Sequence, residues 1–310
     1  MTRNYIGVDL SREHIDICDP RRGEARCANT PATIKRFVAN LGDNDFLVFE
    51  ATSGCDRPLM DEAERAGIAF TRLNPGHAWH FSRSLNLAKT DRVDARMLAR
   101  LGAERQPDPD APRDRARTEL ADLARRRDQL IRMQTQETNR LSECTHPVAR
   151  RDITASLKTL ATRIRRIGEA IDAHLSAHPQ LGKQAELLCT IPGVGEKTAV
   201  ELLAHLPELG QCDRRAVASL GGLAPRARDS GKYRGKRFLG DGRRHIRKAL
   251  YMAALSALRH PHLFGGQVTR MRDSGKPGKV IVIAIARKML VTANAILRSG
   301  TPFAETKCNS

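Results

Sequence analysis

The stretch Tyr-Ile-Gly-Val-Asp at residues 5–9 is a short apolar run that ends on a carboxylate, and it decides how the first third of the chain is expected to fold. A second run of this kind, Phe-Leu-Val-Phe-Glu, occupies residues 46–50. Short runs rich in aromatic and branched residues are typical of buried strands. Because α/β sheets place their chemistry at the carboxyl ends of such strands, Asp9 and Glu50 are candidate functional residues.

The segments around these two runs predict an α/β domain. Three strands in succession, followed by alternating helices and strands, is the order of a ribonuclease-H-like fold. A proline-rich stretch at residues 106–112 then predicts a linker. The predicted strands are 4–10, 14–18, 24–28, 45–50 and 69–74, and the predicted helices are 31–41, 56–66, 76–87 and 91–104.

Two further acids, Asp91 and Asp94, lie three residues apart in the run Lys-Thr-Asp-Arg-Val-Asp-Ala-Arg at residues 89–96. On a helix this spacing places both carboxylates on one face, where their repulsion is usually relieved by a bound cation. Magnesium prefers carboxylate oxygens, and four acids suffice for two ions. We therefore predict that Asp9, Glu50, Asp91 and Asp94 hold Mg2+. Each acid alone has an ordinary alternative, as a turn carboxylate, a strand-end acid or a helix cap.

The charge of the chain favours a polyanionic partner. Of its 310 residues, 53 are Lys or Arg and 35 are Asp or Glu, which gives a formal net charge of +18. Nucleic acid is the simplest such partner, although a ribosomal or membrane-surface protein would share the excess. The cations concentrate between residues 226 and 248, where Lys and Arg far outnumber Asp.

Cysteine usage and hydropathy predict a soluble protein of the cytoplasm. The seven cysteines are scattered and form no Cys-x-x-Cys pair, which is typical of reduced thiols. The N-terminus has no apolar signal region. The longest purely apolar run, residues 280–286, is too short to span a bilayer, and we expect residues 280–297 to form one long core helix.

Residues 113–178 predict two long polar helices that are separated at His146-Pro147. The second helix carries an apolar stripe with spacings of three and four residues, which is typical of a coiled-coil seam. The stripe either packs within the chain, as a helical hairpin on a neighbouring domain, or belongs to an oligomer or a spacer arm. We expect the oligomer or spacer arm, because a narrow apolar stripe on so basic a helix needs a partner. The stripe consists of Ile153, Leu157, Leu160, Ile164, Ile167, Ile171 and Leu175.

The run Ile-Pro-Gly-Val-Gly-Glu-Lys at residues 191–197 is typical of a helix-hairpin-helix turn. Two glycines permit a tight turn whose backbone N–H groups face a phosphate, and Lys197 adds a positive charge. A plain turn between helices is the alternative.

A glycine-rich basic loop follows, and it contains Ser230 in the run Asp-Ser-Gly-Lys at residues 229–232. A serine in such a loop is most often an ordinary hydroxyl, but the surrounding cations could hold a phosphate and stabilise an alkoxide. The cations are therefore predicted to bind nucleic acid, with a merely solvated face as the alternative. They are Arg226, Arg228, Lys232, Arg234, Lys236, Arg237, Arg243, Arg244 and Arg247.

Several of these runs occur in one order along nearly the whole chain. Gly-Val-Asp, Glu-Ala-Thr-Ser-Gly and Lys-Thr-Asp-Arg-Val-Asp-Ala come first, and Ile-Pro-Gly-Val-Gly, Gly-Gly-Leu-Ala-Pro and Ser-Gly-Lys follow. In this order they resemble the DEDD transposases of insertion-sequence family 110, the bridge-RNA-guided recombinases. Gly-Asp-Gly at residues 240–242 departs from the family pattern, which leaves the role of Asp241 open.

The resemblance implies a RuvC-like domain at residues 1–110, a coiled-coil arm at 111–181 and a mainly helical transposase domain at 182–310. It implies that the metal-binding tetrad falls on the four acids named above and that Ser230 is the nucleophile. It also implies donor and target DNA, a structured guide RNA, a homo-oligomer (a dimer or a tetramer), and a bacterial protein associated with the nucleoid. The remaining alternatives are a RuvC-like junction resolvase or nuclease that uses water, and a non-catalytic nucleic-acid-binding protein.

Overall fold

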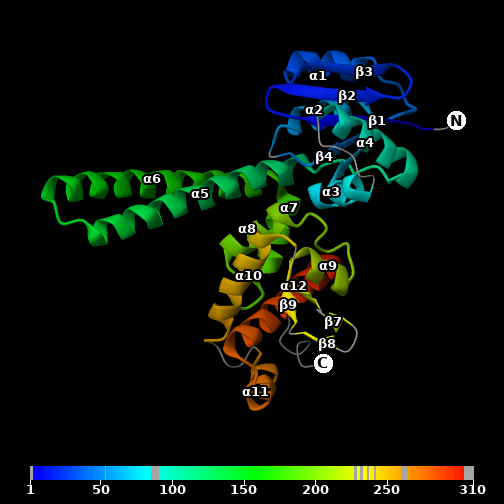
Figure 1. Ribbon diagram of the computed structural model, residues 1–310. Helices are drawn as coiled ribbons and strands as arrows, with labels where there is room; N and C mark the ends of the chain where they lie inside the picture. The colour runs from blue at the N-terminus through cyan, green and yellow to red at the C-terminus, as the bar shows by residue number, and fades with distance from the viewer. Residues whose placement is uncertain are drawn as a thin grey trace. The chain divides into compact units, whose positions relative to one another are not determined.

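The computed structural model describes residues 3–52, 54–84, 91–226, 229–230, 233–235, 237–240, 242–259 and 264–303. The side chains at positions 77, 84, 91–93, 229–230 and 234 lie outside this description. The chain forms two compact units, Met1–Arg113 and Asp114–Ser310 (Figure 1). The first unit is mixed α/β with a central sheet, and the second is mostly helical.

The sheet of the first unit has five strands in the order β3-β2-β1-β4-β5. The first three strands form antiparallel hairpins, whereas β4 and β5 run parallel to β1. This topology is compatible with a ribonuclease-H-like domain, and where the elements are described their bounds lie within two residues of the predicted ones, apart from the end of α3. The strands are β1 (Asn4–Leu10), β2 (His14–Asp19), β3 (Gly23–Ala28), β4 (Asp45–Glu50) and β5 (Ala69–Leu73).

Helices cover both faces of this sheet. One face packs against α1 (Pro31–Ala39) and α2 (Arg57–Ala66), and its core contains Ile6, Val8 and Phe49. The other face packs against α3 (Pro75–Ser84) and α4 (Asp91–Arg105). Side chains point to alternate faces along a strand. The strand residues that alternate with those of the first core therefore belong to the core on the other face of the sheet.

Two glycines allow α4 to lie unusually close to the sheet. A Cβ atom at Gly7 of β1 would lie 2.5 Å from the backbone nitrogen of Ala99 and closer still to the carbonyl oxygen of Ala95. A Cβ at Gly102 of α4 would lie 2.8 Å from Cγ2 of Val48. These are distances that ordinary side chains do not adopt, so glycine is required wherever the helix and strand backbones approach this closely.

The amino-terminal end of the sheet is closed by a buried polar network. The Asn4 amide donates to Asp19 and Asp45 at 3.1 and 2.8 Å, and Arg22 bridges the same two carboxylates at 2.7 and 3.0 Å. Burial raises the pKa of both carboxyls, but the hydrogen bonds from Arg22 and Asn4 outweigh it and hold each pKa below its usual range. These two acids are therefore structural.

The second unit begins with a long helical hairpin of α5 (Arg115–Glu143) and α6 (Pro147–Ala177), which lie side by side (Figure 1). The stripe predicted on α6 therefore has a partner within the chain. Ile171 is 1% exposed and packs in one core with Leu120 and Ala124 of α5, and Leu160 is also buried. The structure thus contains the intramolecular hairpin that the sequence left as the alternative, and the apolar residues of α6 do not by themselves require a second chain.

The rest of the second unit is a helical bundle around α12 (Gly278–Ser299). This helix confirms the long core helix expected from the sequence. It is long and apolar enough to cross a membrane, but Ile285, Ala286, Met289 and Leu290 are fully buried in the bundle. The other helices are α7 (Pro179–Cys189), α8 (Glu196–His205), α9 (Arg214–Leu220), α10 (Arg244–Ala257) and α11 (Gly265–Asp273).

Four very short strands interrupt this bundle where the sequence predicted only a glycine-rich loop. They form two antiparallel pairs, β6 (Pro225–Arg226) with β9 (Phe238–Leu239) and β7 (Asp229–Ser230) with β8 (Tyr233–Arg234).

Candidate functional site

Asp9 and Glu50 are neighbours at the carboxyl ends of two adjacent strands. In the parallel pairing of β1 with β4, Val8 lies opposite Phe49, so the next residue of each strand is one of the two acids. Adjacent strands are about 4.8 Å apart, and residues in register point to the same face. Both acids are partly buried, and by alternation they lie on the face that packs against α4.

The helix α4 carries the other pair of acids to this face. Ala95 lies directly over Gly7, and Leu98 is buried between the helix and the sheet. Asp94 precedes Ala95 and lies one turn before Leu98, so its partly buried side chain is on the same side of the helix. Asp91 lies one further turn toward the start of α4, although its side chain is outside the described residues. The close approach at Gly7 therefore places Asp94 beside the strand that carries Asp9.

This arrangement suits a hard divalent cation. Carboxylate oxygens are the donor set that Mg2+ prefers, and the described acids Asp9, Glu50 and Asp94 are partly exposed. Among the described residues, no three His, Cys, Asp or Glu side chains are placed so that they could hold a metal ion. The structure therefore brings Asp9, Glu50 and Asp94 to one face of the sheet, without forming a metal site from the described side chains.

Ser230 lies in the second unit, at the end of the short strand β7. It pairs with Tyr233 of β8, while Asp229 pairs with Arg234. The side chain of Ser230 and the connecting residues Gly231 and Lys232 lie outside the described residues, as do Arg228, Lys236 and Asp241. The structure therefore places Ser230 at the point where a hairpin turns.

The cations predicted to bind nucleic acid differ in exposure, and the structure describes partners for two of them. Arg226, Arg237, Arg244 and Lys197 are exposed. Arg243 instead forms a two-pronged ion pair with Glu208, at 2.5 and 2.7 Å.

Arg247 is also structurally engaged. It donates to the carbonyl oxygens of Gly222 and Gly240, at 3.2 and 3.1 Å. The prediction that Arg243 and Arg247 serve mainly as phosphate ligands missed these contacts, because their partners lie elsewhere in the sequence.

The glycines of this region are explained by packing. Gly242 has a φ of 76°, and a Cβ there would overlap the backbone of Gly222. Gly193, in the turn between α7 and α8, has a φ of 85°, and a Cβ there would lie 2.7 Å from the carbonyl oxygen of Ala253 in α10. Both turns therefore need glycine for a left-handed backbone and for close contact with a neighbouring segment.

Two family models match successive parts of the chain. Residues 6–146 match the sequence model of the DEDD transposases of IS110 elements, and residues 185–268 match the model described as the transposase IS116/IS110/IS902 family. The chain belongs to the IS110 family of transposases. It is therefore an enzyme that acts on DNA.

Similar proteins extend over the full length of this transposase. It is 29% identical to the pilin gene-inverting proteins of Moraxella bovis and Moraxella lacunata, over 98% of each chain. It is also 28% identical to an uncharacterized 43.6 kDa protein of insertion element IS110 from Streptomyces coelicolor, over 48% of this chain and 36% of that protein.

The transposase has a further acid beside the tetrad that sequence reasoning missed. Asp16 of β2 lies opposite Asp9 in the antiparallel pairing, so the two residues share a face of the sheet. Arg26 of β3 binds both oxygens of Asp16, at 2.9 and 2.7 Å, and neutralises it. The signal in the sequence was that Asp16 stands between two apolar residues of β2, Ile15 and Ile17, and its pairing partners were not readable from that.

Proposed function

We propose that this transposase cuts and rejoins DNA strands with Ser230 as the nucleophile and with Mg2+ held by Asp9, Glu50, Asp91 and Asp94. The observation that supports it most directly is the position of Asp9 and Glu50 at neighbouring strand ends, under the helix that carries Asp94. A carboxylate edge of this kind on a domain with the ribonuclease-H-like strand order is the arrangement of a RuvC-like catalytic domain.

The bound metal would supply charge that stabilises the attacked phosphate and the departing oxygen. The remaining chemistry belongs to the protein. The hydroxyl oxygen of Ser230 loses its proton and forms a bond to phosphorus, while the bond from phosphorus to a deoxyribose oxygen breaks and that oxygen takes up a proton. The result is a serine–DNA phosphodiester, whose energy is retained for rejoining. Lys232 and Arg228 adjoin Ser230 in the sequence and are proposed to stabilise the developing charge.

The full-length relatives support recombination rather than simple hydrolysis. Their name, pilin gene-inverting protein, describes the inversion of a DNA segment, which requires strands to be rejoined as well as cut. We extend this reaction class to the present chain, and with it a structured guide RNA that selects donor and target DNA. The net charge of +18 suits both nucleic acids.

The proposal assigns a role to each part of the chain. Residues 1–110 are the RuvC-like domain, 111–181 are the coiled-coil arm, and 182–310 are the transposase domain with its helix-hairpin-helix-like turn. The exposed cations Lys197, Arg226, Arg237 and Arg244 are proposed to bind phosphates, together with Arg228, Lys232, Arg234 and Lys236. The protein is proposed to act as a homo-oligomer in the bacterial cytoplasm, at the nucleoid.

A covalent-adduct assay tests the nucleophile. Ser230→Ala should bind DNA normally yet form no protease-sensitive protein–DNA adduct, whereas Ser256→Ala, which removes an exposed hydroxyl of α10, should behave like the wild type. Asp9→Asn should abolish the adduct as well, because the metal site is lost. Cleavage by Ser230→Ala at the normal rate would mean that water is the nucleophile and would favour a resolvase.

Mixing the two inactive variants tests whether the site is shared. If the serine of one chain acts with the acids of another, Ser230→Ala mixed with Asp9→Asn should recover activity, because mixed oligomers contain one intact combination. Light scattering on the same samples reports the oligomeric mass. No recovery from a mixture that does form oligomers would place both parts of the site in one chain.

A further inference from the structure

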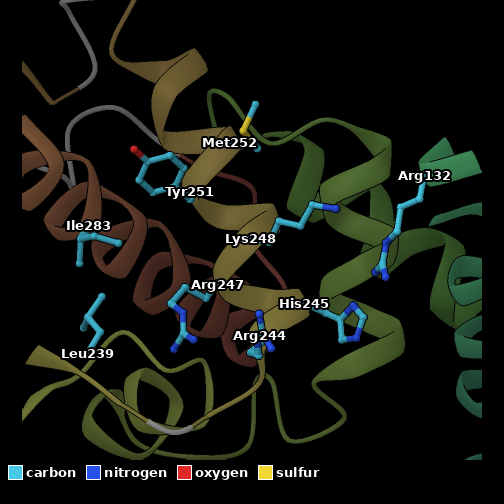
Figure 2. Close-up of a pocket in the computed structure, with 9 residues that line it drawn as sticks. All are labelled: Arg132, Leu239, Arg244, His245, Arg247, Lys248, Tyr251, Met252 and Ile283. Atoms are coloured by element: carbon cyan, nitrogen blue, oxygen red, sulfur yellow. The ribbon is translucent and has the colours of Figure 1, made fainter. Parts of the chain in front are cut away.

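A basic pocket of about 760 Å3 lies in the second unit, where the first turns of α10 face α5 and α12 (Figure 2). Four cationic side chains line it. Arg132 comes from α5, while Arg244, Arg247 and Lys248 come from α10. No carboxylate is among its described lining residues, although His245 also faces it.

One carboxylate outside the lining holds two of these cations. Asp128, one turn before Arg132 on α5, forms ion pairs with both Arg132 and Lys248, the latter at 3.2 Å. Its side chain is 21% exposed, whereas those of Arg132 and Lys248 are 59% and 63% exposed. Burial raises the pKa of Asp128, but the hydrogen bonds from Arg132 and Lys248 prevail and hold that pKa below its usual range. The carboxylate is therefore charged at neutral pH and partly neutralises the pocket.

We propose that this pocket binds the phosphodiester backbone of a nucleic acid, and that Asp128 is an internal counter-ion which the phosphate displaces from Arg132 and Lys248. The inference rests on the proposed function, because it requires a nucleic-acid partner. Arg132 and Lys248 both bind the Asp128 carboxylate, so their spacing also suits a second small anion. A phosphate offers more acceptor oxygens than a carboxylate. Arg247 also lines the pocket, where it donates to the carbonyl oxygens of Gly222 and Gly240.

The remaining lining residues suit the other parts of a nucleotide. Tyr251 and Met252 follow Lys248 along α10 and also line the pocket; in Figure 2 Tyr251 lies on the side of α10 toward Ile283, and Lys248 on the side toward Arg132. Met252 is 59% exposed, so its side chain is accessible to a ligand. A sugar or base can pack on these side chains while its phosphate contacts the cations.

If Asp128 is a counter-ion that competes with phosphate, removing its charge should strengthen nucleic-acid binding. Asp128→Asn keeps the size of the side chain but removes a charge that competes with phosphate, so it should tighten binding about threefold to tenfold at low salt. Asp122→Asn is the matched control, because Asp122 lies on the same helix, pairs with Arg125 and is not a lining residue. A mere change of net charge would affect both variants equally.

Removing the cations should have the opposite effect. Arg132→Gln with Lys248→Gln should weaken binding and reduce the salt dependence, by about 0.7–0.9 in the slope of log K against log salt for each phosphate that the protein no longer neutralises. Arg140→Gln is the control for Arg132→Gln, because it removes an exposed arginine of α5 that also pairs with an acid on its own helix. Circular dichroism verifies that each variant is folded.

The binding measurements use a labelled DNA duplex and an RNA hairpin with equal numbers of phosphates. Tighter binding of only one probe by Asp128→Asn identifies that nucleic acid as the occupant, and tighter binding of both means that the pocket recognises any backbone. Equal affinities for Asp128→Asn and Asp122→Asn on both probes would overturn the inference. That failure is separable from failure of the proposed function, which the absence of a Ser230 adduct would reveal while the binding results stand.

Discussion

Replacement of Gly7 by alanine should damage the acid site without touching any acid. The new Cβ atom would lie 2.5 Å from the nitrogen of Ala99, whereas ordinary contact begins at 3.4 Å, so α4 has to withdraw from β1 by about 0.9 Å or more. The opposing atoms belong to the helix backbone, so no rotation of a side chain relieves the overlap. Because α4 carries Asp94, the withdrawal moves this carboxylate away from Asp9.

We expect Gly7→Ala to lower the rate of strand cleavage strongly and the unfolding free energy moderately. Overpacking of a well-packed interior costs about 1–3 kcal/mol of unfolding free energy. Magnesium tolerates little distortion of its coordination, and a misplacement of about 1 Å at a catalytic site lowers the rate about 100-fold. We therefore expect Gly7→Ala to remain folded at low temperature and to lose about 100-fold in strand cleavage.

The assay is strand cleavage by the full chain under conditions in which circular dichroism shows each variant to be folded, with urea unfolding measured in parallel. Gly42→Ala is the control, because a Cβ there meets nothing within 4 Å. Gly102→Ala should have a smaller effect than Gly7→Ala, since its closest contacts, 2.8 Å from Cγ2 of Val48 and 2.9 Å from Cβ of Tyr5, are side-chain atoms and not backbone atoms. Wild-type cleavage and stability in Gly7→Ala would refute the reasoning that the helix must touch the strand here.

Two further predictions concern the second unit. Burial, together with the nearby charges of His245, Arg125 and Arg243, lowers the pKa of His205 to about 4 from an ordinary 6.5, so the unfolded state takes up the proton first as the pH falls. Between pH 7 and pH 5 the unfolding free energy should fall by about 2 kcal/mol because of this residue. In urea unfolding experiments, His205→Phe should lack that part of the decrease. If the unfolding free energies of the wild type and His205→Phe depend on pH in the same way, the burial of a neutral imidazole is contradicted. Arg243→Ala should lower the melting temperature because Glu208 loses its partner, whereas Arg244→Ala should weaken nucleic-acid binding at an unchanged melting temperature. The reverse pattern would show Arg243 to be the phosphate ligand.

The local sequence was sufficient for the elements of the first unit and for its acids. Strands β1 and β4 are readable because buried strands are short apolar runs, and the acids stand out because each ends such a run. Asp91 and Asp94 are readable as a pair because helical spacing is a property of neighbouring residues. The order of these elements also predicts the sheet, since few topologies connect three successive strands to alternating helices and strands.

Contacts between distant segments were decided only by the tertiary structure. The stripe on α6 predicts that an apolar partner exists, but it cannot say whether that partner is α5 or another chain, because both satisfy the same periodicity. In the same way, Arg243 and Arg244 are adjacent in the sequence, yet only the first meets Glu208.

The ion pair of Lys248 with Asp128 shows most clearly what the sequence does not predict, because the two residues are 120 positions apart in the chain. Charge and spacing are local properties of the sequence, so they identify which residues can take part in binding or catalysis. Which of them are free to do so depends on the partners that folding brings from elsewhere in the chain. That is why the sequence by itself determined the strands and identified the candidate acids, and only the packing decided which cations pair with partners from distant segments.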